Sequence, residues 1–102
     1  MSGSVSAWSL SRAAEEDLIG IWLEGAEVFG AAQADRYQDG IASTFKLLAA
    51  FPEMARERSE LRPPLRVHPY GSHLIVYLVR PDGDVFVVRV RHRREDWTTE
   101  PV

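Results

Sequence analysis

The sequence of 102 residues contains no cysteine, a single lysine and no long apolar run. Without cysteine, a disulfide framework, a Cys-ligated zinc site and a thiol nucleophile are all excluded. No stretch approaches the roughly 20 apolar residues that a membrane helix needs. The opening residues, MSGSVSAWS, lack the basic and then apolar segments of a secretion signal. We therefore expect a cytoplasmic protein that has no membrane contact.

Histidine is also scarce, and the three histidines are His68, His73 and His92. They do not form the helical pair that is typical of zinc enzymes. Phosphate-binding loops are missing, because Gly71 and Gly83 stand alone in turn-like segments. No serine has the Gly-x-Ser-x-Gly setting of a hydrolase nucleophile. We expect neither a metal nor a cofactor.

The basic side chains are almost all arginine, and most of them lie in the second half of the chain. Residues 1–55 hold three basic and eight acidic side chains, whereas residues 56–94 hold nine arginines and four acidic side chains. The planar guanidinium group suits carboxylate and phosphate partners. This division favours an acidic protein or a polyanion as partner without choosing between them. A hydrated surface of mixed charge is the alternative interpretation.

Length and a hydrophobic fraction of 45% predict one folded domain that spans residues 1–102. We expect its ends, residues 1–4 and 97–102, to be flexible. The clearest local pattern is a β-hairpin, in which Leu74–Val79 and Val85–Val90 flank a Pro-Asp-Gly-Asp turn. The first strand is apolar on both faces and should lie at the centre of a sheet. In the second strand, alternation predicts one face made of Phe86, Val88 and Val90 and another made of Val85, Val87, Arg89 and Arg91.

Two helices precede this hairpin. Apolar residues recur at three- and four-residue spacing from Arg12 to Phe29, after Ser11 as a cap, and again from Ala31 to Phe51, before Pro52. A short strand within Val5–Leu10 should come first. Residues 53–63 read as a long charged connection, and residues 65–70 as a further strand. Three aromatic residues should lie in the core: Trp22, Tyr37 and Phe45.

Together these elements predict an α+β fold. An N-terminal strand is followed by an antiparallel helical hairpin and then by a three-stranded antiparallel meander. The helices should cover one face of the sheet. The other face would be partly apolar and ringed with arginine.

One enzymatic interpretation remains open from the residues. His73, Tyr77, Arg89 and His92 fall on or just beyond neighbouring strands. Arginine could stabilise negative charge while histidine moves protons, as metal-free RNA cleavage requires. The alternative, which we prefer, is that these side chains serve packing and local hydrogen bonding.

Four segments together resemble a known family. They are LSRAAEEDLIGIW, QADRYQDGIASTFKLLAAFPEM, ELRPPLRVHPYGSHLIVYLV and VVRVRHRRED. In this order they are similar to the ParE-type toxins of the ParE/RelE toxin–antitoxin superfamily, from about Trp8 to Asp96. The resemblance implies a bacterial toxin with a RelE/ParE-like fold that inhibits DNA gyrase, stalls replication and damages DNA.

The resemblance also implies partners. A ParD-type antitoxin would neutralise the toxin in a hetero-oligomer, and contact with DNA would be only indirect, through the antitoxin. An apolar face ringed with arginine suits an acidic, amphipathic segment that folds on binding. The family pattern falls on Arg58, Leu61, Arg62, Arg66, His73, Tyr77, Arg89, His92, Arg93, Arg94 and Asp96.

From these positions we select two sets of candidate residues. The candidates for toxicity and target binding are Arg89, His92, Arg93 and Arg94. The candidates for antitoxin binding are Arg58, Arg62, Arg66, His73, Tyr77, Val85, Val87 and Arg91. No residue is assigned a catalytic role.

Two alternatives to gyrase inhibition are carried forward. A RelE-type, ribosome-dependent messenger ribonuclease is the first, although those relatives typically use a tyrosine near the C-terminus and this chain has none after Tyr77. Trp97 stands in that region instead. The second is an interaction module without toxicity. The short polar ending, TTEPV, is a further departure from the family in a region linked with toxicity, where activity could be reduced.

Overall fold

The computed structural model describes residues 7–95, so the expected flexibility of residues 1–4 and 97–102 lies outside the described residues. Two helices and five strands follow one another along the chain. They are β1 (Trp8–Leu10), α1 (Arg12–Phe29), α2 (Ala31–Ala50), β2 (Glu57–Arg58), β3 (Leu65–Tyr70), β4 (His73–Val79) and β5 (Val85–His92).

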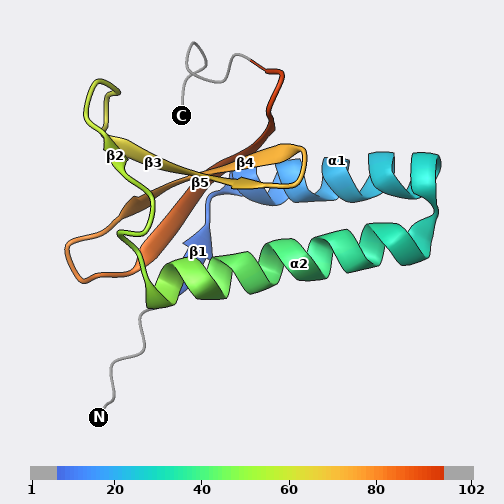
Figure 1. Cartoon of the computed structure of the whole chain (residues 1–102), viewed down its shortest axis with the longest axis horizontal. Coiled ribbons are helices and arrows are strands. Elements are labelled where there is room, and N and C mark those ends of the chain that lie inside the picture. The colour runs from blue at the N-terminus through green and yellow to red at the C-terminus, as the bar shows by residue number, and fades with distance from the viewer. Residues whose placement is uncertain (1–6, 96–102) are drawn as a thin grey trace.

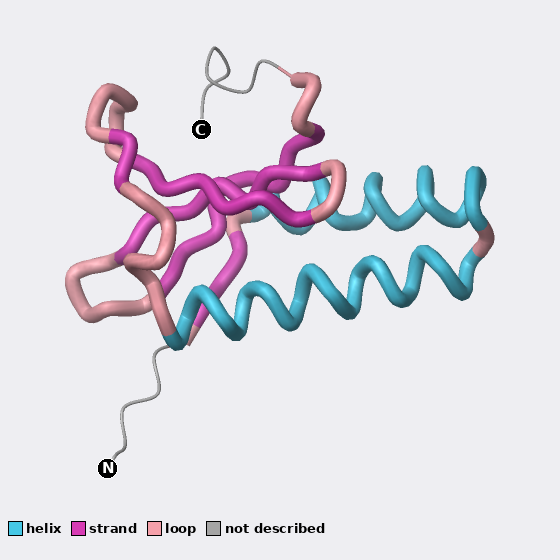
Figure 2. Tube along the Cα trace, viewed as in Figure 1, coloured by secondary structure: helices cyan, strands magenta, loops and turns pink. Residues whose placement is uncertain are grey.

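The strands form one sheet in the order β1-β5-β4-β3-β2. All neighbours are antiparallel except β1, which runs parallel to β5. The helical hairpin forms a second layer and extends past the sheet at its α1–α2 end (Figures 1 and 2). The predicted α+β class, the helical hairpin and the central place of β4 are confirmed.

Ser11 joins the first strand to the first helix. Its side-chain oxygen accepts the Ala14 N–H at 2.9 Å, as a helix cap does, and donates to the Val88 carbonyl at 2.6 Å. The Ser11 N–H donates to the Val87 carbonyl at 2.9 Å, which extends the β1–β5 pairing. The start of α1 is therefore fixed directly to the edge of β5.

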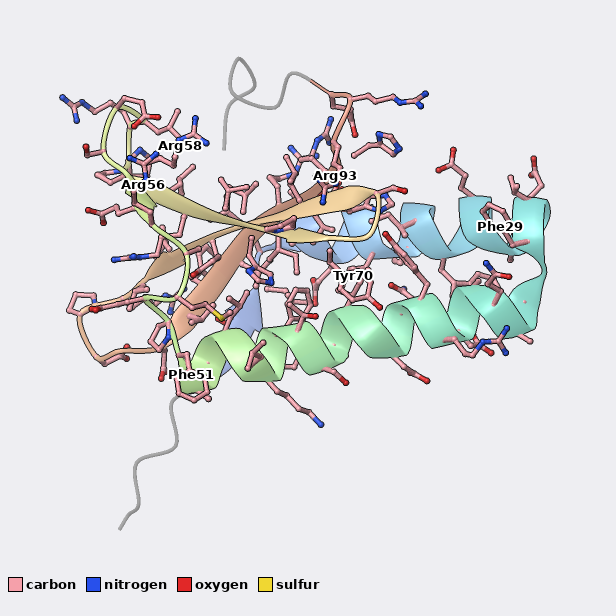
Figure 3. The ribbon with its side chains drawn as sticks, viewed as in Figure 1. Phe29, Phe51, Arg56, Arg58, Tyr70 and Arg93 are labelled. Atoms are coloured by element: carbon pink, nitrogen blue, oxygen red, sulfur yellow. The ribbon has the colours of Figure 1, made fainter. Side chains whose placement is uncertain are left out.

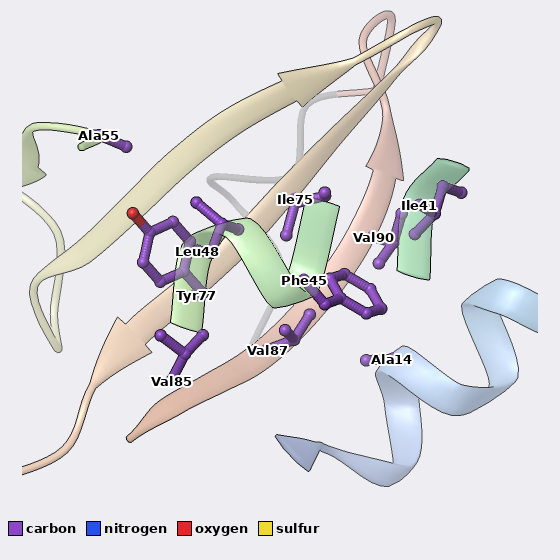
Figure 4. Packing of buried hydrophobic residues seen from close by; sticks show 10 residues of the cluster. All are labelled: Ala14, Ile41, Phe45, Leu48, Ala55, Ile75, Tyr77, Val85, Val87 and Val90. Carbon is purple, nitrogen blue, oxygen red and sulfur yellow. The ribbon is translucent and has the colours of Figure 1, made fainter. Parts of the chain in front are cut away.

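The main core lies between the sheet and the helices (Figure 4). Helix α2 contributes Ile41, Phe45 and Leu48, each at most 1% exposed. Strand β4 contributes Ile75 and Tyr77, which have no exposed surface. A second, smaller cluster on the other face of the sheet contains Leu65, Val76 and Val88.

A β-bulge overturns the predicted faces of β5. Val76 pairs with Arg89 whereas Tyr77 pairs with Val87, so Val88 is an extra residue that opposes no single partner. An extra residue shifts the alternation by one position. Val90 therefore joins the main core on the helix side, and Val88 packs on the opposite face.

Two further expectations were wrong. The connection over residues 53–63 contains the short strand β2, whose Glu57 and Arg58 pair with Arg66 and Leu65. Two polar residues carry no strand pattern, so only the pairing with β3 creates this strand.

Trp22 is half-buried between the helices and donates Nε1–H to Asp35 at 2.8 Å, whereas Phe45 is in the core as expected. In the described part of the chain, neither helix is both long and apolar enough to cross a membrane.

Candidate functional site

Four aromatic side chains meet where the β3–β4 turn approaches the helices: Tyr37, Tyr70, His73 and His92. The Tyr37 hydroxyl lies 2.8 Å from Nδ1 of His73 and accepts the Ser72 N–H at 3.1 Å. The His73 and His92 rings stand edge to face, with centroids 5.3 Å apart. Tyr70 pairs with His73 across the turn and packs against Tyr37, so four elements, α2, β3, β4 and β5, contribute to the cluster.

Burial sets the protonation of this cluster. Removal from water lowers the pKa of His73, and the nearby His92 lowers it further, while the carboxylates of Glu24, Glu95 and Asp17 act in the opposite direction. Burial also raises the pKa of the Tyr37 hydroxyl. His73 is 9% exposed. His73 and Tyr37 are therefore both neutral at neutral pH and share a hydrogen bond.

An ion network lies next to the histidines along the free edge of β5. Asp17 on α1 accepts two hydrogen bonds from the Arg89 guanidinium, at 2.8 and 3.0 Å, and one from the Val90 N–H at 3.0 Å. Arg91 is 3.6 Å from Asp17 and also pairs with Glu95. Glu95 in turn accepts the His92 N–H at 2.9 Å. The end of β5 is thereby fixed to α1.

The four candidates for toxicity fall into two groups. Arg89 is half-buried and bound to Asp17, and His92 is half-buried against His73. Arg93 and Arg94 are exposed at the end of β5, where Figure 3 labels Arg93. The Arg93 Nε donates to the Gly71 carbonyl at 2.8 Å, which positions that side chain over the β3–β4 turn. Only Arg93 and Arg94 are freely accessible to a large partner.

Three of the arginine candidates for antitoxin binding, Arg58, Arg62 and Arg66, lie on β2, on β3 or between them, at the other edge of the sheet from β1. Figure 3 labels Arg58. Arg58 pairs with Glu60 at 2.7 Å, and that bond lowers the pKa of Glu60. Arg66 donates to the Ala55 carbonyl at 2.6 Å, while Arg62 is exposed. Arg58 stands opposite Leu65 and borders the face of the sheet that the helices leave uncovered, whereas Arg66 stands opposite Tyr77, which faces the helices.

Three of the antitoxin-binding candidates lie elsewhere. Tyr77, Val85 and Val87 have no exposed surface and face the helices, because the bulge in β5 and the alternation along β4 turn them into the main core. The Tyr77 hydroxyl donates to the Pro52 carbonyl at 2.9 Å, and burial raises its pKa. These three residues are withdrawn as contact residues. His73 and Arg91, the remaining candidates, belong to the histidine cluster and the ion network.

The uncovered face of the sheet has an apolar centre. Leu78 and Phe86 are half-buried there against the smaller core cluster, and the half-buried Leu74 lies on the same face of β4 as Val76 by strand alternation. The Arg80 guanidinium lies 4.4 Å from the centroid of the Phe86 ring, a cation–π contact. The expectation of a partly apolar face bordered by arginine is thus met, with Leu74, Leu78 and Phe86 in place of Val85 and Val87.

Two adjoining hollows lie on the helix side. The larger, of about 410 Å³, runs between the outer half of the helical hairpin and the β3–β4 turn, with His73 and His92 on its wall. The smaller, of about 280 Å³, lies beside Asp17, Glu24 and Arg91. Asp17, Glu24 and Tyr37 were not selected from the sequence. Their positions in the predicted helices did not indicate that they would contact β5 or the β3–β4 turn.

The structure does not assemble the catalytic constellation considered above. His73 and His92 are adjacent, but Tyr77 is bonded to Pro52 in the core and Arg89 is held by Asp17. Among residues 7–95, no group of three or more His, Asp or Glu side chains is placed to hold a metal ion.

Comparison with known proteins identifies the family. Residues 9–97 match the family model described as ParE toxin of type II toxin-antitoxin system, parDE. The chain belongs to the ParE toxin family. Toxin ParE1 of Mycobacterium tuberculosis is 36% identical over 91 residues, which cover 89% of this chain and 93% of that protein. Toxin ParE of Escherichia coli is 34% identical over 95 residues, or 93% of this chain and 92% of that protein.

A solved structure shares the ParE fold seen here. It is described as the chromosomal ParDE TA system from P. aeruginosa and superposes with a TM-score of 0.72. The match covers 86% of this chain and 96% of the other, at 17% identity. This likeness supports the arrangement of a helical hairpin on one sheet.

Proposed function

We propose that this ParE-family protein is the toxin of a type II toxin–antitoxin pair, that it inhibits DNA gyrase, and that a ParD-type antitoxin neutralises it. The match of residues 9–97 to the ParE toxin family carries the proposal. Relatives named as ParE toxins align over about nine-tenths of the chain. The similar solved structure belongs to a ParDE system, which supports a ParD-type partner.

The uncovered face of the sheet supplies a surface for the antitoxin. Its apolar centre around Leu74, Leu78 and Phe86 adjoins Arg58, which stands opposite Leu65, and the exposed Arg62. An acidic, amphipathic segment fits both parts, since its apolar side chains would cover the centre and its carboxylates would meet the guanidinium groups. The exposed Arg93 and Arg94 at the end of β5 are the proposed target-binding residues.

Growth after induction tests this function. Expression of the chain alone should arrest growth, and co-expression of the small protein encoded beside it should restore growth. If growth arrest persists with that protein in excess, the proposed antitoxin pairing fails. If the chain alone never slows growth, the toxin assignment itself fails.

A messenger ribonuclease is the second candidate, and one observation favours it. His73 and His92 stand together on the wall of a 410 Å³ hollow, where two imidazoles could exchange a proton with a bound nucleotide. Mapping of messenger ends after induction discriminates the two functions. New cleavage sites in translated messengers would favour the ribonuclease, and intact messengers during growth arrest would remove it.

A further inference from the structure

The larger hollow has the form of a groove for a helix. Five residues of α1 line it at helical spacing: Ile21, Glu24, Gly25, Val28 and Phe29. Ala34 and Tyr37 of α2 line the facing side. The α1 residues that line the groove span two helical turns. A helix docked in a groove contacts it through apolar side chains at positions i, i+3, i+4 and i+7, which also span two turns.

The outer end of this groove is apolar and open to solvent. Val28 is 63% exposed and Phe29 is 65% exposed, and Phe29 is labelled near the end of the helical hairpin in Figure 3. Two large apolar side chains next to a groove of about 410 Å³ form a patch that a partner would be expected to cover.

The charge of the groove comes from a single carboxylate. Glu24 is the only acidic or basic residue, apart from the two histidines, that lines the larger hollow. No ion pair joins Glu24 to another residue within the described range 7–95. Arg91, which lines the adjoining hollow together with Glu24, pairs with Asp17 and Glu95.

We propose that this groove binds an amphipathic helical segment of the antitoxin whose apolar side chains pack on Val28 and Phe29 and whose lysine or arginine pairs with Glu24. The inference rests on the proposed toxin–antitoxin pairing and adds a second docking surface to it. Charge complementarity selects the segment, because an acidic helix would be repelled by Glu24. The uncovered face of the sheet, in contrast, suits an acidic segment. The two surfaces would therefore bind different segments of the antitoxin.

The direct test is the affinity of the antitoxin encoded beside the toxin gene for three forms of the toxin. Glu24→Lys should raise Kd by about tenfold or more, since an ion pair becomes a like-charge contact. Glu27→Lys is the matched control, because Glu27 is exposed on the same helix and does not line the groove. A Kd for Glu24→Lys that equals that of the control would overturn the inference.

A second test does not depend on the antitoxin. Two synthetic helical peptides carry the same apolar stripe, flanked by lysine in one and by glutamate in the other. The lysine peptide should bind the wild-type protein, and Glu24→Lys should reverse the preference. Binding of the peptides in this pattern, with no binding of the antitoxin, would refute the proposed pairing but not the groove. Equal binding of both peptides, or a concentration-dependent dimer that Glu24→Lys dissociates, would refute the groove assignment.

Discussion

Asp17 of α1 binds the guanidinium of Arg89 on β5 through two hydrogen bonds, of 2.8 and 3.0 Å. The same carboxylate accepts the Val90 N–H at 3.0 Å. Strand β1 pairs with β5 only as far as Val87, so beyond this point Asp17 takes the place of a strand partner. One side chain therefore aligns the helical hairpin with the basic end of the sheet.

Replacement of this carboxylate should destabilise the fold. Asp17→Asn keeps the shape but removes the negative charge that Arg89 and Arg91 share, and their side chains are only 20% and 15% exposed. We expect a loss of roughly 2–4 kcal/mol in the free energy of unfolding, measured by urea denaturation. Glu16→Gln, at the exposed neighbouring position, should change stability by less than about 0.5 kcal/mol. Equal effects of the two changes would show that the Asp17 contacts contribute little.

The histidine cluster predicts a stability that falls with acid. Burial and the adjacent His92 hold the pKa of His73 below its ordinary value of 6.5. As the pH falls, His73 therefore takes up a proton in the unfolded chain before it does so in the folded protein. Its contribution to the free energy of unfolding is fully present above pH 6.5 and is lost as the pH falls below that value. Unfolding free energies at pH 7.5 and 5.5 should differ more in the wild type than in His73→Asn. Equal pH dependence in both would assign the effect to other groups, such as His68, whose pKa burial also lowers.

Two glycines in the helices should respond to alanine in opposite directions. A Cβ at Gly20 would meet nothing within 4 Å, so Gly20→Ala should stabilise the protein by about 0.5–1 kcal/mol through helix propensity. A Cβ at Gly40 would overlap the hydroxyl of Tyr70, whose ring packs between the sheet and α2 (Figure 3). Gly40→Ala should therefore cost about 1–3 kcal/mol. Thermal unfolding of both variants measures the contrast, and a stabilised Gly40→Ala would mean that the Tyr70 ring moves freely.

Two aromatic residues that the sequence did not distinguish should differ in their effect on stability. Phe45 is 1% exposed and packs against Trp8 with ring centroids 5.1 Å apart. Phe45→Ala should cost roughly 3–5 kcal/mol. Trp22 is half-buried and bonded to Asp35, so Trp22→Phe should cost only about 1 kcal/mol. A larger loss at Trp22 than at Phe45, measured by denaturant unfolding, would contradict the observed packing.

Much of the fold could be predicted because its signals are local. Ser11, Gly30 and Pro52 mark helix ends, and the two apolar runs around Gly83 mark the hairpin. The faces of β5 could not be predicted, because the extra residue at Val88 shifts an alternation that looks regular in the sequence. Strand β2 was missed since its two polar residues become a strand only by pairing with β3.

The candidate site could be predicted only in part. The exposure of Arg93 and Arg94 follows from their position at the end of an apolar strand. The role of Asp17 could not be inferred, because an acidic residue in an early helical turn has a sufficient local explanation in the helix dipole. Its pairing with Arg89 joins residues 72 positions apart in the chain.

The exposed arginines at the end of β5 should affect toxicity more than folding. Arg93→Ala with Arg94→Ala removes two charges from the surface and one bond to the Gly71 carbonyl. We expect this variant to fold and to be less toxic, so that the number of cells surviving induction rises by about tenfold or more. Arg58→Ala with Arg62→Ala, at the opposite edge, is the matched control and should leave toxicity unchanged while weakening the antitoxin complex. Full toxicity in the folded Arg93 and Arg94 variant would place the target-binding surface elsewhere.

The most direct measurement is a gyrase supercoiling assay with the purified wild-type protein. Excess protein should inhibit supercoiling of relaxed plasmid, and addition of the purified antitoxin should restore it. The variant that lacks the Arg93 and Arg94 side chains should inhibit less than the wild type. Unchanged supercoiling at a large excess of folded wild-type protein would contradict gyrase as the target.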